Sequence, residues 1–284
     1  MKLVRYGAAG KEKPGLIDAN GVLRDLSSVI HDIDTPTLSR EGLARLAAID
    51  PQSLPQVAGE PRYGAPVAHV GKFICVGLNY SEHAAETNAP IPEQPILFMK
   101  ATSALMGPND DVIIPQGSVK TDWEVELGVV IGETARSVSV EQALDHVAGY
   151  VVVNDLSERE FQLEHGGQWV KGKSCDTFGP IGPWLVTTDD VPDPQNLGLW
   201  LEVDGHRYQD GNTRTMIFGV AQLVSYISRY MTLLPGDVIS TGTPSGVGLG
   251  QKPPTYLRAG NTIELGIAGL GTQRQRVRAH PNDQ

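Results

Sequence analysis

Positively charged residues are scarce in this chain, and long apolar runs are missing. Its 23 Lys and Arg residues stand against 33 Asp and Glu residues, so the formal net charge is -10. This balance argues against nucleic-acid binding, which needs clustered cations, and against docking on an anionic membrane surface. No run approaches the roughly 18 apolar residues of a membrane helix. Residues 1–10 also lack the apolar core of a secretory signal. We therefore expect a cytoplasmic protein without nucleic-acid or membrane partners.

Cysteine is equally scarce, whereas glycine and proline are abundant. Cys75 and Cys175 lie far apart and form no Cys-x-x-Cys motif, so neither a thiol zinc site nor a disulfide framework is indicated. We expect both thiols to be reduced and mostly buried. The 32 Gly and 20 Pro residues follow no repeating period, which predicts many turns between short strands. With 40% hydrophobic and 20% charged residues, the composition is that of a globular protein.

Hydrophobic patterning predicts many short strands and few helices. Strands are expected at 2–6, 15–18, 22–26, 72–77, 96–99, 112–115, 123–131, 150–155, 184–188, 197–203, 237–240, 262–267 and 274–278, and helices at 41–49, 140–146 and 214–230. Because strands and helices do not alternate regularly, a doubly wound sheet or a (β/α)8 barrel is disfavoured. A mixed, β-rich α+β roll or sandwich fits better. The proline-rich run 51–66 predicts a boundary between a small N-terminal α+β domain, residues 1–66, and a main domain, residues 67–284.

Two glutamates in one predicted strand are candidate metal ligands. Glu124 and Glu126 are separated by one residue within the strand 123–131. At the two-residue period of a strand, both carboxylates point to the same face. If they are buried, their mutual repulsion favours a cation between them, and Mg²⁺ and Ca²⁺ prefer carboxylate oxygens. The alternative is the solvent-facing edge of an antiparallel strand. Spacing alone leaves both interpretations open.

Two further charged residues lie in suggestive places. Asp155 ends the apolar strand 150–155, and functional residues accumulate at strand ends. As an alternative, Asp155 caps the turn 157–162. Lys173 lies among glycines and apolar residues, where a partly buried ammonium group can stabilise an anion. The alternative is an ordinary surface lysine.

A histidine and a glutamate form a candidate general base. His83 and Glu86 lie three residues apart, which on a helix places them on one face. There the carboxylate can orient the imidazole, and such a pair can deprotonate water. An exposed, hydrogen-bonded pair on a short helix is the alternative, and local spacing does not exclude it.

Two glycine-containing motifs do not complete a known site. In the segment 242–246, Ser245 stands one place too late for the nucleophile elbow of hydrolases. The segment 246–250, Gly-Val-Gly-Leu-Gly, does not complete a dinucleotide-binding fingerprint and follows no βα unit. We expect these glycines to form turns.

Taken together, six segments of the chain resemble the fumarylacetoacetate hydrolase family. They follow the order of that family from about residue 72 to residue 278, and the joint match is specific although each segment alone is modest. The segments are Phe73–His83, Pro95–Lys100, Trp123–Gly128, Asn154–Arg159, Lys171–Ser174 and Ser240–Pro244. One departure is visible, because many members of the family have Arg where Leu78 stands here. We interpret it as a subgroup mark that affects the substrate and not the metal.

The resemblance implies a role for each candidate residue. It implies that Glu124, Glu126 and Asp155 hold Mg²⁺ or Mn²⁺, with Ca²⁺ as a substitute in crystals. It also implies that Lys173 faces the substrate, and that His83 and Glu86 activate water. Four residues are expected to line the pocket: Tyr80, Arg159, Gln162 and Thr243. The family fold is a β-rich roll that usually dimerises, so a homodimer or a higher homo-oligomer is expected, with a small N-terminal domain.

The whole chain resembles a bacterial subgroup that acts on 2,4-diketo-3-deoxy-L-rhamnonate or its L-fuconate analogue. The expected activity is divalent-metal-dependent hydrolysis of a carbon–carbon bond in such a 2-oxo acid, giving pyruvate and a hydroxy acid such as lactate. Ureidoglycolate lyase, oxaloacetate decarboxylase, acylpyruvate hydrolase and dienoate isomerase are alternatives within the same family. A metal-dependent dicarboxylate binder without turnover is an alternative of another class. The intact pair of His83 and Glu86 speaks against such a binder.

Overall fold

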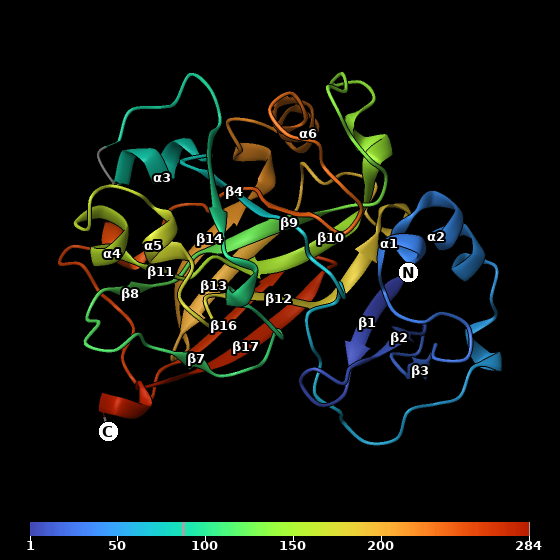
Figure 1. Cartoon of the computed structure of the whole chain (residues 1–284). Helices are drawn as coiled ribbons and strands as arrows, with labels where there is room; N and C mark the ends of the chain where they lie inside the picture. Colours follow the sequence, from blue (N-terminus) through green and yellow to red (C-terminus); the bar gives the residue numbers. More distant parts are fainter. Residues whose placement is uncertain (87–88, 284) are drawn as a thin grey trace.

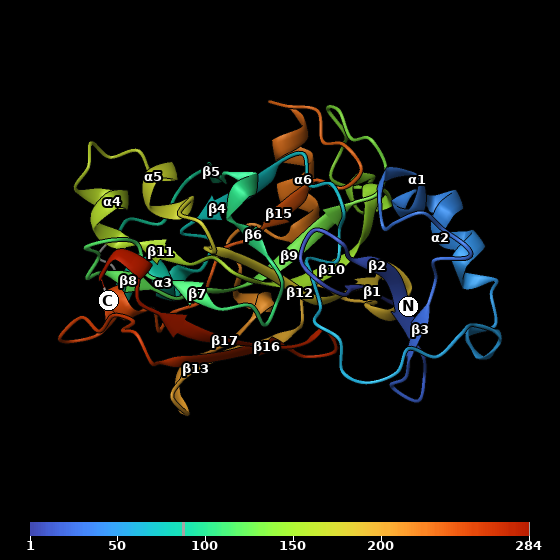
Figure 2. The same cartoon turned by 60° about the horizontal axis from the view of Figure 1, so that its bottom comes forward.

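Residues 1–86 and 89–283 are described by the computed structural model, which is built around two stacked β-sheets (Figure 1, Figure 2). The larger sheet has ten strands in this part of the chain. Its main path runs β3 (Leu23–Asp25), β2 (Lys13–Ile17), β1 (Lys2–Tyr6), β12 (Gly179–Thr187), β10 (Val147–Asn154), β9 (Val125–Ile131), β15 (Val238–Ser240), β4 (Phe73–Gly77) and β5 (Ile96–Lys100). The short strand β6 (Leu105–Met106) pairs with β12 beside this path. All neighbours on the path are antiparallel except β15 and β4.

A five-stranded sheet lies against the larger one, as Figure 2 shows. Its order is β14 (His206–Asn212), β13 (Gly198–Val203), β16 (Thr262–Ile267), β17 (Gly271–Arg278) and β7 (Val112–Ile113). A two-stranded ribbon joins β8 (Thr121–Asp122) to β11 (Ser157–Glu158). The α-helices are short: α1 (Thr35–Leu38), α2 (Arg40–Ala47), α3 (Ser81–Glu86), α4 (Arg159–Leu163), α5 (Val170–Lys173) and α6 (Val220–Ser228). The β-rich α+β prediction is therefore confirmed, and the described strands close no barrel.

Strands β9 and β10 are buried along their whole length because both faces of the larger sheet are covered. Val125, Leu127 and Val129 belong to the core between the two sheets. Val130 and Val151 belong to a second core, which includes apolar residues of the N-terminal segment. A strand covered on both faces has apolar residues at successive positions, and each buried side chain contributes about 1.5–3 kcal/mol. These two strands are thus a rigid support for side chains at their ends.

The N-terminal strands extend the larger sheet. Strand β1 pairs antiparallel with β12, with Leu3 opposite Leu185, and β2 and β3 follow outward from β1. The boundary at residue 66, the homodimer and the cytoplasmic location stay predictions. Among the described residues, no helix is long and apolar enough to cross a membrane.

Three predicted elements differ from the structure. The helix predicted at 214–230 begins only at Val220, because Asn79 binds the backbone before it: its carbonyl accepts from Ile217 N at 2.8 Å, and its Oδ1 accepts from Phe218 N at 2.8 Å. The helix predicted at 140–146 is a short 3-10 turn, η3 (Ala143–His146). The strand predicted at 123–131 is interrupted at residues 123–124, which leave the larger sheet to join β8. Strand β14 was not predicted.

Candidate active site

Three buried carboxylates converge where β9 and β10 meet. Glu126 lies in β9, Glu124 lies just before it, and Asp155 follows the last residue of β10. Strand pairing brings these segments together, and Asp155 N donates to the Glu124 carbonyl at 2.9 Å. One carboxylate oxygen from each residue lies within 4.8 Å of the other two. The prediction that Glu124 and Glu126 share a face is confirmed.

Three buried cations compensate these carboxylates. Lys173 Nζ lies 2.7 Å from Glu124 Oε2 and 2.9 Å from Asp155 Oδ2. Lys100 Nζ donates to Asp155 Oδ1 at 2.5 Å and to the Leu156 carbonyl at 2.9 Å. Arg159 Nη2 lies 2.7 Å from Glu124 Oε1. The cations hold two of the acids, Glu124 and Asp155, in charged hydrogen bonds.

Glu126 has different partners and a different pKa. It accepts hydrogen bonds from Ser240 Oγ at 2.6 Å and from Gly242 N at 2.8 Å. Burial raises its pKa well above the usual range, and the charges of Asp155 and Glu124 raise it further. Burial also acts to raise the pKa of Glu124, but Lys173 and Arg159 outweigh burial and hold that pKa well below its usual range. The site therefore favours an additional positive charge next to Glu126.

The donor set suits a hard divalent cation. Three carboxylates offer oxygen ligands, which Mg²⁺ and Mn²⁺ prefer, and no softer sulfur ligand is needed. A divalent cation between the three oxygens would relieve the repulsion that raises the pKa of Glu126. Glu124, Glu126 and Asp155 are the residues that would hold it.

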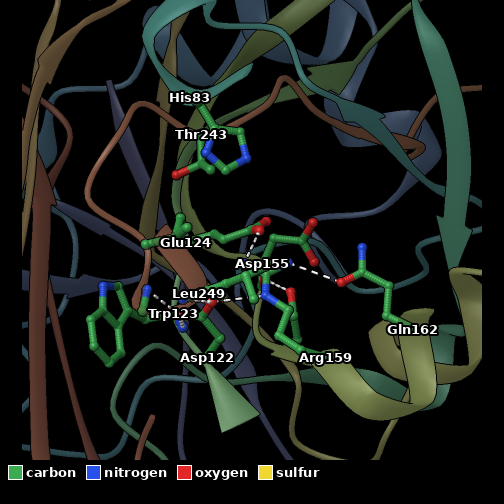
Figure 3. Close-up of polar contacts among 12 residues, drawn as sticks. His83, Asp122, Trp123, Glu124, Asp155, Arg159, Gln162, Thr243 and Leu249 are labelled. Atoms are coloured by element: carbon green, nitrogen blue, oxygen red, sulfur yellow. Dashed lines mark hydrogen bonds and ion pairs between the residues drawn. The ribbon is translucent and has the colours of Figure 1, made fainter. Parts of the chain in front are cut away.

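The predicted histidine–glutamate pair is formed on α3. His83 Nδ1 lies 2.8 Å from Glu86 Oε1, and the second oxygen, Oε2, accepts from Gly246 N at 2.8 Å. His83 is 7% exposed and lines a cavity that is also lined by Glu124, Glu126 and Lys173. The alternative of an exposed surface pair is therefore wrong. Figure 3 shows the imidazole near Thr243, on the side of Glu124 that faces away from Asp122 and Arg159.

The cavity is small, about 200 Å³, and both polar and apolar side chains line it. Its polar wall consists of His83, Glu124, Glu126, Arg159, Gln162, Lys173 and Thr243. Its apolar wall consists mainly of Val76, Leu78, Phe98, Leu163, Trp169 and Leu249. Leu78 has a φ of 52°, a left-handed conformation that is unusual for a bulky residue and is found more often at functional sites than elsewhere.

The sequence of the chain matches a known protein family over most of its length. The model described as the C-terminal part of fumarylacetoacetate (FAA) hydrolase matches residues 72–278. The chain belongs to the fumarylacetoacetate hydrolase family. The chain is an enzyme of this family.

Solved structures of the family align along nearly the whole chain. The fumarylacetoacetate hydrolase of Exiguobacterium antarcticum is 36% identical with a TM-score of 0.88, over 99% of this chain and 100% of that chain. The maleylpyruvate hydrolase of Sphingobium sp. SYK-6, in complex with manganese(II) and pyruvate, is 29% identical with a TM-score of 0.82, over 98% of this chain and 99% of that chain. A Burkholderia cenocepacia relative is 66% identical over 279 residues, 98% of this chain and 99% of its own, and its name specifies no substrate.

Three of the four residues expected to line the pocket of this family member do so. Arg159, Gln162 and Thr243 border the cavity, and Gln162 Oε1 accepts from Arg159 Nη1 at 3.0 Å. Tyr80 does not border it in the described part of the chain. Its backbone forms a bridge with Met216 and its ring is buried, where burial and the charge of Glu126 raise its pKa.

The alternatives for the charged residues are overturned by burial. Glu124 and Glu126 are 4% and 2% exposed, so they do not lie on a solvent-facing edge. Lys173 is 2% exposed and is not a surface lysine. Asp155 does not cap the helix that follows, because the side chain of Glu158 accepts from Glu160 N there.

Two charged residues of the site were not predicted. Lys100 was part of a family-like segment, but a charged residue at the end of an apolar strand does not reveal its partner. Asp122 is fully buried and accepts from Arg159 Nε at 2.8 Å, with the backbone amides of Gly248 and Leu249 as further donors (Figure 3). Asp122 stands two residues before Glu124, at the two-residue period of a strand, and this spacing is the local signal for it.

Proposed function

We propose that this family member hydrolyses a carbon–carbon bond of a 2,4-diketo acid with a divalent cation bound, and that it releases pyruvate and a second carboxylic acid. One observation carries the proposal: Glu124 and Glu126 line the same small cavity as Lys173 and the hydrogen-bonded His83. The candidate metal ligands, the ammonium group of Lys173 and the candidate base His83 therefore line one cavity. Such a combination suits water attack beside a developing enolate.

The positive groups of the site stabilise negative charge. When bound to Glu124, Glu126 and Asp155, Mg²⁺ or Mn²⁺ would supply a Lewis acid for the oxygen of an enolate. Burial acts to lower the pKa of Lys173, but Asp155 and Glu124 outweigh burial and raise it above the usual value. Lys173 thus stays protonated, and it acts as a fixed cation near the substrate and not as a base.

His83 is the proposed base for the attacking water. The carboxylate of Glu86 accepts a hydrogen bond from His83 Nδ1, which orients the ring and stabilises the imidazolium that forms. Because Nδ1 is engaged in this way, Nε2 is the atom that takes the proton. The water oxygen bonds to C4 of the substrate, and the bond between C3 and C4 breaks. The proton now held by His83 then passes to C3, which becomes the methyl group of pyruvate. The second product keeps C4 as its carboxyl carbon.

The charges of the site match a substrate with one carboxylate. We define the charge cluster as four buried carboxylates and three buried cations: Asp122, Glu124, Glu126, Asp155, Lys100, Arg159 and Lys173. Its formal charge is -1, which a divalent cation changes to +1. One 2-oxo carboxylate would then neutralise it. Buried charge is costly unless it is balanced, so a monoanionic substrate fits better than a dianionic one.

The apolar wall agrees with an uncharged acyl group. Among the described residues that line the cavity, Arg159 and Lys173 are the permanent cations, and carboxylates already bind both. Leu78, Phe98 and Trp169 offer contact to a methyl or short alkyl end. A 2,4-diketo-3-deoxy-L-rhamnonate or L-fuconate, which ends in a methyl group, suits this wall. We propose such a sugar acid as the natural substrate.

A substrate panel tests the proposal. The enzyme is assayed with an acylpyruvate, a 2,4-diketo-3-deoxy sugar acid, oxaloacetate and ureidoglycolate, each with Mn²⁺ and with EDTA, and pyruvate and glyoxylate are measured. We expect metal-dependent pyruvate release, fastest from the diketo sugar acid. Glyoxylate as the main product would replace the proposal by a lyase, and binding without any turnover would replace it by a dicarboxylate binder.

A further inference from the structure

The loop Gly246–Gly250 uses its backbone amides to bind two carboxylates. Gly246 N donates to Glu86 Oε2 at 2.8 Å. Gly248 N and Leu249 N donate to the two carboxylate oxygens of Asp122, at 2.6 Å and 2.9 Å. The sequence alone assigns no function to this glycine motif. Its amides face an anion on each of two sides, which is how oriented backbone dipoles stabilise negative charge.

The contact with Glu86 fixes the direction of the imidazole. One oxygen of Glu86 binds His83 Nδ1 and the other binds Gly246 N, so both oxygens of the carboxylate are engaged. A carboxylate held at both oxygens cannot rotate freely. The loop therefore acts on His83 through Glu86.

The contact with Asp122 ties the loop to the charge cluster. Asp122 is fully buried, and its Oδ2 also accepts from Arg159 Nε at 2.8 Å. Arg159 in turn donates from Nη2 to Glu124 Oε1 at 2.7 Å. Figure 3 shows Asp122 between Leu249 and Arg159, with Glu124 beside them. A continuous series of charged hydrogen bonds thus leads from the loop to a proposed metal ligand.

The glycines are required by close contacts. A Cβ atom at Gly250 would lie 2.7 Å from Cδ and Oε2 of Glu86, so this carboxylate packs directly on the glycine. A Cβ atom at Gly248 would lie 2.0 Å from the Thr255 carbonyl oxygen. Gly246 has a φ of 104°, which other residues rarely adopt. Glycine at these three positions therefore lets the loop keep this conformation and pack directly on the carboxylate of Glu86.

We propose that Gly246–Gly250 is the seat that holds the His83–Glu86 pair at the cavity, and that Asp122 is the positioning residue that fixes this seat relative to Arg159 and Glu124. The role of His83 in this statement rests on the proposed hydrolysis. The seat itself rests on the contacts alone. A methyl group added at Gly250 should displace Glu86 without touching the carboxylates of the charge cluster, whereas loss of the Asp122 charge should affect both the position of Glu86 and the charge cluster.

The decisive variant is Gly250→Ala, with Gly198→Ala as its control. Nothing lies within 4 Å of a Cβ atom at Gly198, and its φ is ordinary, so the control adds the same methyl group without a clash. We expect kcat for acylpyruvate hydrolysis to fall at least tenfold in Gly250→Ala, with KM and the Mn²⁺ and oxalate affinities within about threefold of the wild type. The control should match the wild type. An unchanged kcat in Gly250→Ala would overturn the proposal.

Two further measurements separate this proposal from the proposed function. Hydrogen exchange of residues 81–86 should be faster in Gly250→Ala than in Gly198→Ala, and this holds whether or not any substrate is hydrolysed. Equal protection in both variants would refute the seat, whereas an inactive wild type would refute only the proposed function. Asp122→Asn should lower kcat and also weaken Mn²⁺ binding several-fold. Intact Mn²⁺ binding with wild-type kcat in that variant would refute the role of Asp122.

Discussion

Replacing Lys100 by methionine should destabilise the metal-free protein by about 3 kcal/mol. The side chains of Lys100 and Asp155 are both 0% exposed, and they lie 2.5 Å apart. At an effective dielectric constant of about 20, such a pair attracts by roughly 7 kcal/mol, and the cost of burying the charges offsets part of this. Removing one partner of a buried pair costs about 3–5 kcal/mol. We expect the lower end, because Lys173 still binds Asp155 at 2.9 Å.

Thermal and denaturant unfolding in EDTA measure this loss. For a chain of this size, about 3 kcal/mol corresponds to a fall in Tm of roughly 6–10 °C. Lys120→Met is the matched control, because its partner Glu164 is 57% exposed and an exposed ion pair contributes about 0–1 kcal/mol. A loss below about 1 kcal/mol in Lys100→Met, or an equal loss in Lys120→Met, would refute the reasoning.

The same variant also tests the charge cluster. Without Lys100 the formal charge of the cluster falls from -1 to -2, so it attracts a divalent cation more strongly. Added Mn²⁺ should therefore raise the Tm of Lys100→Met by more than it raises the Tm of the wild type. An equal or smaller rise would show that the cation does not bind beside Asp155.

Three other substitutions separate the proposed roles. Glu126→Gln should lower Mn²⁺ affinity at least a hundredfold by calorimetry and abolish turnover with it; if both persist, Glu126 is not a ligand. His83→Ala should keep Mn²⁺ and oxalate binding while kcat for hydrolysis falls about 10²–10⁴-fold, and full hydrolysis in that variant would place the base elsewhere. Leu78→Arg adds a cation to the apolar wall, so kcat/KM for maleylpyruvate relative to acetylpyruvate should rise about tenfold; an unchanged ratio would show that Leu78 does not select the acyl group.

Local periodicity predicted the parts of the site that lie within single strands. Glu124 and Glu126 share a face because side chains alternate along a strand, and that rule needs no tertiary information. The apolar run that ends at Asp155 likewise marked a buried strand and its end. The pairing of His83 with Glu86 followed from the spacing of a helix.

Contacts between distant segments could not be predicted in this way. Lys100 and Asp155 are 55 residues apart, and they meet only because their segments converge on one site. The start of α6 depends on Asn79, about 140 residues earlier, which binds the backbone at Phe218 and overrides an apolar helical pattern. The function of the loop Gly246–Gly250 depends on Asp122 in the same manner. Long-range pairing, and not local propensity, decided each of these features.

Hydrolysis of an acylpyruvate in ¹⁸O-labelled water tests the central claim most directly. Metal-dependent attack of water on C4 predicts pyruvate together with a second acid that carries the ¹⁸O label in its carboxylate, in the presence of Mn²⁺ and not in EDTA. Turnover that leaves the second product unlabelled, or that continues at the same rate in EDTA, would contradict it.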